Sequence, residues 1–200
     1  LPELRITLPA DGILDPQAAF SGPLRDIWLE VGFGGGEHLA AQARAHPDIG
    51  FIGCEPFING VANLLSLIER DGLTNVRIFD DDARKLFAAL PGAVFGRVFA
   101  LYTDPWPKKR HHKRRLVQGA FLDLLADRLI RSGQVHFASD NVGYAESILE
   151  TIDRSPAWLN LAGAGHWAPR PRYRVITRFE HRALRDQRRV YEIAIAKVTG

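Results

Sequence analysis

The sequence predicts an α/β protein with a mostly parallel sheet and helices on both of its faces. Short apolar runs alternate five times with longer amphipathic stretches from residue 26 onward. Most of the amphipathic stretches stop at Pro or Gly, as helices do. Five strand–helix units in a row imply parallel strands joined by crossover helices. The length of 200 residues suits one domain. We therefore expect an incomplete N-terminal extension over residues 1–25 and a single domain over residues 26–200.

The first two units show the pattern. Residues 26–31 (DIWLEV) are a strand-length apolar run that ends in glycines, and residues 37–45 are rich in Ala, Leu and Gln, which favour helix until Pro47. A second strand follows at 50–54, and a second helix at 58–70 stops before Gly72. The other three units place strands and helices in turn over 75–79, 83–90, 97–102, 114–131, 134–139 and 142–152.

After Pro156 the composition changes. Residues 158–171 are rich in Gly, Pro and Trp, which predicts a loop. Two runs with strand composition follow, at 173–179 and 189–198. They are expected to add a hairpin at the edge of the sheet, which brings it to seven strands.

Several protein classes are excluded at this point. Cys54 is the single cysteine, so a disulfide framework and a Cys-based zinc site are excluded, and the seven histidines show no metal-ligand spacing. No apolar run approaches the ~18 residues of a membrane-spanning helix. The N-terminus also lacks the pattern of a signal peptide. We expect a soluble cytoplasmic protein without a metal.

The first strand leads into a turn with almost no side chains. Gly32, Gly34 and Gly36 alternate there, as close approach of the backbone to a ligand requires. The dinucleotide fingerprint places its last glycine one position later, and Glu37 in the first helical turn would repel a phosphate. A cofactor with a nucleoside and no phosphates is favoured over a purely structural turn.

Acidic residues follow the next two strands. Glu55 comes 23 residues after Gly32, near the position where a carboxylate reaches a ribose in such folds. Residues 80–82 are three consecutive aspartates; one can cap the next helix and another can reach an amino group of a ligand. Each acid alone is better explained by a helix cap or a solvated charge than by a ligand contact. At successive strand ends, however, they predict a nucleoside pocket.

The fourth strand is followed by Asp104-Pro105-Trp106-Pro107 and by the basic run 108–115. The prolines stiffen this loop, and Trp106 offers a plane on which a base could stack. A basic run is often a solvated helix face or a localisation signal. Directly after a strand that reaches the pocket, it indicates a site for a phosphate backbone.

These motifs resemble one family. Glu30-x-Gly32-x-Gly34-x-Gly36, Gly53-x-Glu55, the run 104–115 and Thr177-Arg178-Phe179-Glu180 are similar to the bacterial tRNA (guanine-N7-)-methyltransferases, over residues 26–198. The glycine turn is generic to methyltransferases that use S-adenosylmethionine, whereas the basic run followed by Thr-Arg-Phe-Glu is specific. The resemblance implies a Rossmann-like class I methyltransferase domain that methylates N7 of a guanine in the tRNA variable loop.

The resemblance also implies roles for individual residues. Asp104 would be catalytic, and seven residues would bind S-adenosylmethionine: Glu30, Gly32, Gly34, Gly36, Glu55, Asp82 and Asp104. The tRNA would contact Lys108, Asp140, Thr177, Arg178, Phe179 and Glu180. The protein would act as a monomer or a homodimer, without a membrane or an obligate protein partner. Three features depart from the family: Thr103 stands where Pro is usual, Asp186-Gln187 replaces a Gly-containing turn, and the basic N-terminal arm is missing.

The expected chemistry needs little acid–base machinery, because N7 of guanine has a lone pair and no proton to lose. Asp104 would orient the base and stabilise the positive charge that develops on it. Alternatives stay open: an exocyclic-amine nucleic-acid methyltransferase, although Trp106 lies one place early for its motif, and an RNA-binding module with a vestigial pocket. A nicotinamide-dependent oxidoreductase is disfavoured by the glycine spacing, and a C5-pyrimidine methyltransferase would need a nucleophilic cysteine, whereas Cys54 is expected inside a strand.

The net charge of +3 conceals a strong asymmetry. Residues 108–115 and 170–189 each carry +6, which leaves −9 for the rest of the chain. Two cationic segments on an acidic body are expected to contact RNA phosphates.

Overall fold

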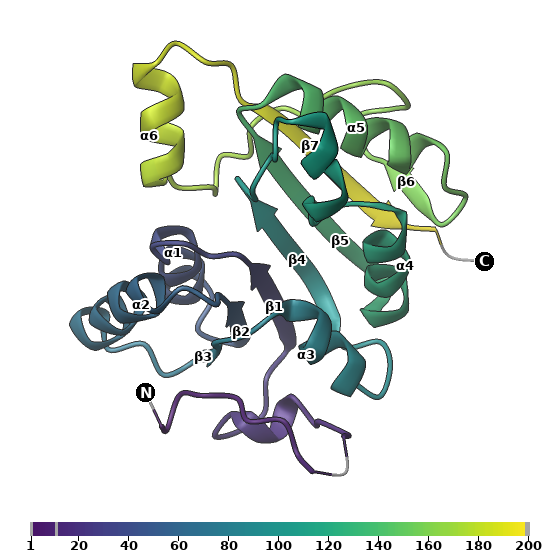
Figure 1. Ribbon diagram of the computed structural model, residues 1–200. Helices are drawn as coiled ribbons and strands as arrows, with labels where there is room; N and C mark the ends of the chain where they lie inside the picture. The colour runs from purple at the N-terminus through teal and green to yellow at the C-terminus, as the bar shows by residue number, and fades with distance from the viewer. Residues whose placement is uncertain (1, 11, 199–200) are drawn as a thin grey trace.

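The computed structural model describes residues 2–10 and 12–198 and contains one seven-stranded sheet (Figure 1). Residues 1 and 11 of the expected extension and residues 199 and 200 of the expected domain lie outside the described part. The strand order is β3-β2-β1-β4-β5-β7-β6; β7 pairs antiparallel with β5 and β6, and the other described strand pairs are parallel. The strands are β1 (Asp26–Val31), β2 (Ile49–Cys54), β3 (Val76–Phe79), β4 (Phe95–Leu101), β5 (Leu129–Ser139), β6 (Trp158–Asn160) and β7 (Tyr191–Lys197). The prediction of a mostly parallel seven-stranded sheet is confirmed.

Helices cover both faces of the sheet. Buried residues of α1 (Glu37–Ala45) and α2 (Ile58–Asp71) pack on one face. Those of α3 (Ala83–Ala89), α4 (Gly119–Arg128) and α5 (Val142–Asp153) pack on the other. The helices that follow the strands therefore change face between β1 and β4, and Figure 1 shows α1 and α2 to the left of β1 and α4 and α5 to the right of β4. In open parallel sheets, ligands bind at this switch point, beyond the carboxyl ends of the strands.

The described part of the N-terminal segment packs against the domain. Ile6, Leu14 and Phe20 are buried in the core on the α3–α5 face, and Arg5 forms a parallel bridge with Ile78 of β3. Figure 1 shows this segment at the end of the sheet opposite α6 (Arg178–Arg185). It therefore contributes to the core, and its Arg5 reaches the carboxyl end of β3, where it forms an ion pair with Asp80 at 2.8 Å.

The predicted helix over 114–131 is wrong at both ends. Lys109–Arg114 is a separate 3₁₀ turn (η2), and α4 covers Gly119–Arg128. Residues 129–133 belong to β5, where Leu129 pairs with Phe95 of β4 and both side chains are buried. Pairing with β4 thus outweighs the helix propensity of this stretch. The composition of residues 129–133 alone cannot predict this long-range pairing.

The predicted strand over 173–179 is also wrong. Thr177 caps α6, because its side chain accepts a hydrogen bond from the Glu180 amide, at 3.3 Å. Thr-x-x-Glu is a helix-start signal, and here it overrides the β-branched residues before it. The hairpin partner of β7 is instead β6, which lies inside the segment predicted to be a loop.

The end of α6 suggests a stabilising substitution. Gln187 has φ +55°, and the amides of Gln187 and Arg188 close the helix on Leu184 O (3.0 Å) and Ala183 O (2.8 Å). Glycine is favoured at such a left-handed position, where other residues lose about 1 kcal/mol. Gln187→Gly is expected to raise the free energy of unfolding by about 1 kcal/mol in urea titrations. Gln187→Ala keeps the backbone penalty and should give no gain; a less stable glycine variant would contradict the assignment.

Candidate functional site

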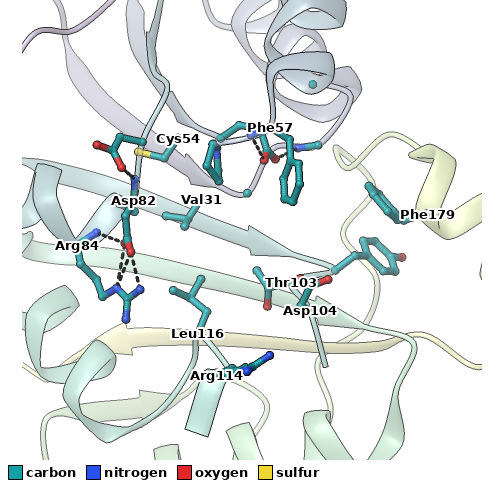
Figure 2. A pocket seen from close by; sticks show the side chains of 18 of the residues that line it. Val31, Cys54, Phe57, Asp82, Arg84, Thr103, Asp104, Arg114, Leu116 and Phe179 are labelled. Atoms are coloured by element: carbon teal, nitrogen blue, oxygen red, sulfur yellow. Dashed lines mark hydrogen bonds and ion pairs between the residues drawn. The ribbon is translucent and has the colours of Figure 1, made fainter. Parts of the chain in front are cut away.

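A cleft of about 570 Å³ lies beyond the carboxyl ends of β1, β2 and β4. This volume suits a small organic ligand. Its walls come from six places in the sequence: the glycine turn after β1, the start of α2, the start of α3, the loop after β4, the end of η2 and the start of α6. Figure 2 shows Asp82 and Arg84 on one side of the cleft and Asp104 and Phe179 on the other.

The glycine turn presents bare backbone to the cleft. Gly32 (φ +71°) and Gly34 (φ +56°) line it, in a conformation that disfavours other residues. A Cβ atom on Gly34 would lie 2.7 Å from Cε2 of Phe179, so α6 packs directly on the turn. Gly36 (φ +78°) packs against Leu64 of α2 instead and does not line the cleft.

The two glutamates of the first two strands have different positions. Glu55 lines the cleft and accepts hydrogen bonds from the backbone amides of Gly34 (2.8 Å) and Phe57 (3.1 Å). It therefore fixes the turn and also faces the cleft. Glu30 is buried, with Oε2 2.8 Å from Nδ1 of His38, and joins β1 to α1 without lining the cleft.

Asp82 combines the two roles that the sequence assigned to different aspartates. It caps α3 by accepting a hydrogen bond from the Arg84 amide at 2.9 Å, and it lines the cleft. Hydrogen bonds from the Arg84 guanidinium lower the pKa of Asp82. Asp82 is therefore an anion at neutral pH, able to accept hydrogen bonds from a ligand.

The loop after β4 carries Asp104 into the cleft. None of the described residues donates a hydrogen bond to its carboxylate, which is exposed. Two residues of this loop, Tyr102 (φ +54°) and Trp106 (φ +42°), have left-handed backbone conformations that are uncommon for aromatic side chains. The guanidinium of Arg114 lies 5.0 Å from the Trp106 ring centroid, so the basic η2 turn folds back on this loop.

Two of the four residues of the Thr-Arg-Phe-Glu motif reach the cleft. Arg178 and Phe179 line it, and the Phe179 ring stacks on Tyr102 with centroids 6.3 Å apart. Thr177 is the cap of α6. Glu180 is buried and forms ion pairs with Arg170 (2.6 Å) and Arg174 (2.8 Å).

Glu180 belongs to a buried ionic network that the sequence analysis missed. The fully buried guanidinium of Arg174 also pairs with Glu192 of β7, whose second oxygen lies 3.3 Å from Nε2 of His136 on β5. This network ties the segment before α6 to two strands. Its only sequence signal is a pair of charged or polar residues, His136 and Glu192, inside runs that are otherwise apolar.

Acid should weaken this network. Burial by itself would raise the pKa of Glu180, but hydrogen bonds and charge from Arg170 and Arg174 outweigh it and hold that pKa below its ordinary 4.5. A lowered pKa adds stability that is complete above pH 4.5 and is lost as the pH falls through the folded value. Between pH 5 and pH 3, the free energy of unfolding should therefore fall more steeply for the wild type than for Glu180→Gln. Parallel urea-derived curves would contradict this.

The remaining predicted residues lie outside the cleft. Lys108 is exposed just before η2, and Asp140 after β5 forms an ion pair with Arg188 at 3.1 Å. Phe57, which the sequence analysis did not single out, lines the cleft with its side chain 73% exposed. Of the predicted site residues, the cleft brings together Gly32, Gly34, Glu55, Asp82, Asp104, Arg178 and Phe179. It does not include Glu30, Gly36, Lys108, Asp140, Thr177 or Glu180.

Sequence comparison identifies the family. A family described as "Putative methyltransferase" matches residues 25–193. The tRNA (guanine-N(7)-)-methyltransferase of Rhodospirillum rubrum is 44% identical over 190 residues, which cover 92% of this chain and 74% of that protein. The corresponding protein of Chelativorans sp. is 44% identical over 201 residues, 99% of this chain and 86% of its own length. The chain belongs to the tRNA (guanine-N(7)-)-methyltransferase family.

Solved structures place this tRNA (guanine-N(7)-)-methyltransferase family member in a wider fold. An rRNA methylase from Streptococcus thermophilus aligns with a TM-score of 0.61 at 10% identity, over 88% of this chain and 89% of that one. A putative methyltransferase from Streptococcus mutans in complex with SAH aligns with a TM-score of 0.59 at 10% identity, over 88% and 90%. At this identity the likeness concerns the fold, and it confirms the predicted Rossmann-like class I architecture. Within the described residues, no helix has the length and apolarity to cross a membrane.

Proposed function

We propose that this chain transfers the methyl group of S-adenosylmethionine to N7 of a guanine in tRNA, in the variable loop, and so forms 7-methylguanosine. The observation that carries the proposal is the shared cleft. Its lining combines a glycine turn and the carboxylates of Glu55 and Asp82 with the carboxylate of Asp104 and with Arg178 and Phe179 of α6. The names of the sequence relatives support the same reaction.

The glycine turn and the cleft residues that follow β2 and β3 fit S-adenosylmethionine. Bare backbone at Gly32 and Gly34 allows a ligand to approach closely. Glu55 and Asp82 supply carboxylate oxygens for ribose hydroxyls and amino groups, and Phe57 offers an exposed ring to the adenine. When bound, this cofactor supplies a methyl group that its sulfonium sulfur makes electrophilic.

Asp104 faces the acceptor base in this proposal. A carboxylate without a partner can accept hydrogen bonds from the N–H groups of the guanine Watson–Crick edge, which turns N7 toward the methyl group. N7 carries a lone pair and no proton, so Asp104 has no proton to remove. It orients the base and stabilises the positive charge that grows on the purine.

The tRNA backbone would contact cations on both sides of the cleft. Arg114 and Arg178 line it, and η2 and α6 continue outward with further exposed cations. Each phosphate contact adds about 0.9 to the slope of log affinity against log salt for duplexes. Lys109→Gln/Arg110→Gln should therefore flatten that slope by about 2.

The matched control for this salt titration is Arg25→Gln/Arg154→Gln. These exposed cations lie before β1 and after α5, at the opposite end of the sheet. The control should keep the wild-type slope. An unchanged slope in Lys109→Gln/Arg110→Gln would mean that these residues form only a solvated surface.

The deciding experiment incubates bulk tRNA with S-adenosylmethionine carrying a labelled methyl group and then identifies the labelled nucleoside. Label in 7-methylguanosine is the expected result. Label on an exocyclic amine would favour the rival methyltransferase, and no incorporation would favour an RNA-binding module. Protection against thermal unfolding by S-adenosylmethionine and not by NAD would test the oxidoreductase alternative separately.

The proposal extends to organisation and location. We propose one methyltransferase domain over residues 26–200 with residues 1–25 as an extension, which the family match over 25–193 supports. A cytoplasmic location fits a tRNA substrate.

A further inference from the structure

We propose that Tyr144 and Arg115 are positioning residues for Asp104, because they fix the residues on either side of it to α5. The inference rests on the methyl transfer proposed above. Asp104 has no hydrogen-bond donor among the described residues. Its neighbours Thr103 and Pro105, in contrast, each form a hydrogen bond with a buried side chain.

Tyr144 holds the residue before Asp104. Its side chain is fully buried on α5, and its hydroxyl lies 3.1 Å from Oγ1 of Thr103. The same hydroxyl accepts a hydrogen bond from the Val117 amide at 3.1 Å, which leaves its own proton for Thr103. Burial raises the pKa of Tyr144, so the phenol keeps that proton at neutral pH. Thr103 lacks the ring restraint of a proline, and this hydrogen bond restrains it instead.

Arg115 holds the residue after Asp104. Its Nε donates to the carbonyl oxygen of Pro105 at 2.8 Å, and its Nη1 donates to Oγ of Ser147 on α5 at 3.1 Å. The guanidinium also lies 5.1 Å from the Tyr144 ring centroid. Only 8% of Arg115 is exposed, so this last residue of the basic run serves the loop and is not available to a phosphate.

The two tethers explain how an unpartnered carboxylate can have a defined position. The left-handed conformations of Tyr102 and Trp106 are costly and persist only where surrounding contacts impose them. Thr103 and Pro105, which lie between them, are the two tethered positions. Asp104 is thereby held facing the cleft without a hydrogen bond that a guanine would have to displace, which is the preorganisation that orientation catalysis requires.

The test removes, one at a time, the two hydroxyl groups that form the Tyr144–Thr103 hydrogen bond. Tyr144→Phe and Thr103→Val should each lower kcat for tRNA methylation about tenfold and leave KM for S-adenosylmethionine within about twofold. The double variant should be no worse than Tyr144→Phe, since both changes break the Thr103–Tyr144 hydrogen bond and Tyr144→Phe alone also removes the acceptor of the Val117 amide. Thr103→Ser keeps the hydroxyl and should retain wild-type kcat. Thr151→Val, which removes a hydroxyl elsewhere on α5, is the matched control.

A second measurement needs neither cofactor nor tRNA. Hydrogen exchange at the Val117 amide should be faster in Tyr144→Phe than in the wild type and unchanged in Thr151→Val. If the wild type transfers no methyl group, the proposed function fails, and the exchange data alone then decide whether the Val117 amide and the Tyr144 hydroxyl form the hydrogen bond that fixes this hydroxyl beside Thr103. With an active wild type, undiminished kcat in both single variants, or losses that multiply in the double variant, would overturn the positioning role.

Discussion

Asp104→Ala is expected to lower kcat for tRNA methylation by about 10³-fold while S-adenosylmethionine still protects the protein from thermal unfolding. The side chain is assigned to the base, and removal of one preorganised electrostatic group costs about 10²–10³ in rate. Asp104→Asn keeps an oxygen that accepts a hydrogen bond from the guanine edge but loses the charge. It should therefore retain much more activity than the alanine variant.

This ranking separates two mechanisms for Asp104. An obligatory general base would be lost equally in both variants, whereas orientation depends on the hydrogen bond that asparagine preserves in part. Asp123→Ala on α4 removes an exposed aspartate and should leave kcat unchanged. Wild-type turnover in Asp104→Ala would remove the residue from the mechanism.

Arg174→Met is expected to destabilise the protein by about 3–5 kcal/mol, the largest effect on stability among our predictions. The fully buried guanidinium pairs with Glu180 and Glu192, and its loss leaves buried carboxylates that other groups neutralise only in part. Urea titration at neutral pH measures the change. The matched control is Arg172→Met, since Arg172 lies in the same segment with an exposed side chain.

A double variant tests the physical reason for this loss. Arg174→Met/Glu192→Gln removes one of the carboxylates that would otherwise be left without a cation. It should recover part of the stability lost in Arg174→Met. If Arg174→Met unfolds no more easily than Arg172→Met, the network contributes nothing to stability.

Secondary structure was predicted best from the sequence where it depends on residues that are close together along the chain. Helix α1 begins and ends where its Ala-rich composition and Pro47 predict, because helix formation is local. Strand β6 was missed because three residues become a strand only by pairing with β7, about 35 positions later. The strand predicted over 173–179 was wrong because residues 173–177 have no regular structure and α6 begins at Arg178, after the Thr177 cap.

Motif spacing located the cleft but did not assign every carboxylate. Glu55 and Glu30 both lie at or near the ends of strands, and one faces the cleft while the other pairs with His38. Glu180 stands beside Phe179 in the sequence and yet points into the ionic network. The order of residue types in a motif does not predict whether a carboxylate side chain points into the cleft or into the core. It also does not predict which cation forms an ion pair with that carboxylate.

Cys54 gives this protein a practical advantage for spectroscopy. It is the chain's single cysteine, it is buried at the end of β2, and burial raises the pKa of its thiol far above neutrality. The thiolate is the form of cysteine that attacks maleimide reagents, so the buried, protonated native thiol should stay unlabelled. A cysteine introduced at an exposed position such as Arg182 on α6 would then take a fluorophore selectively, without first removing the native cysteine.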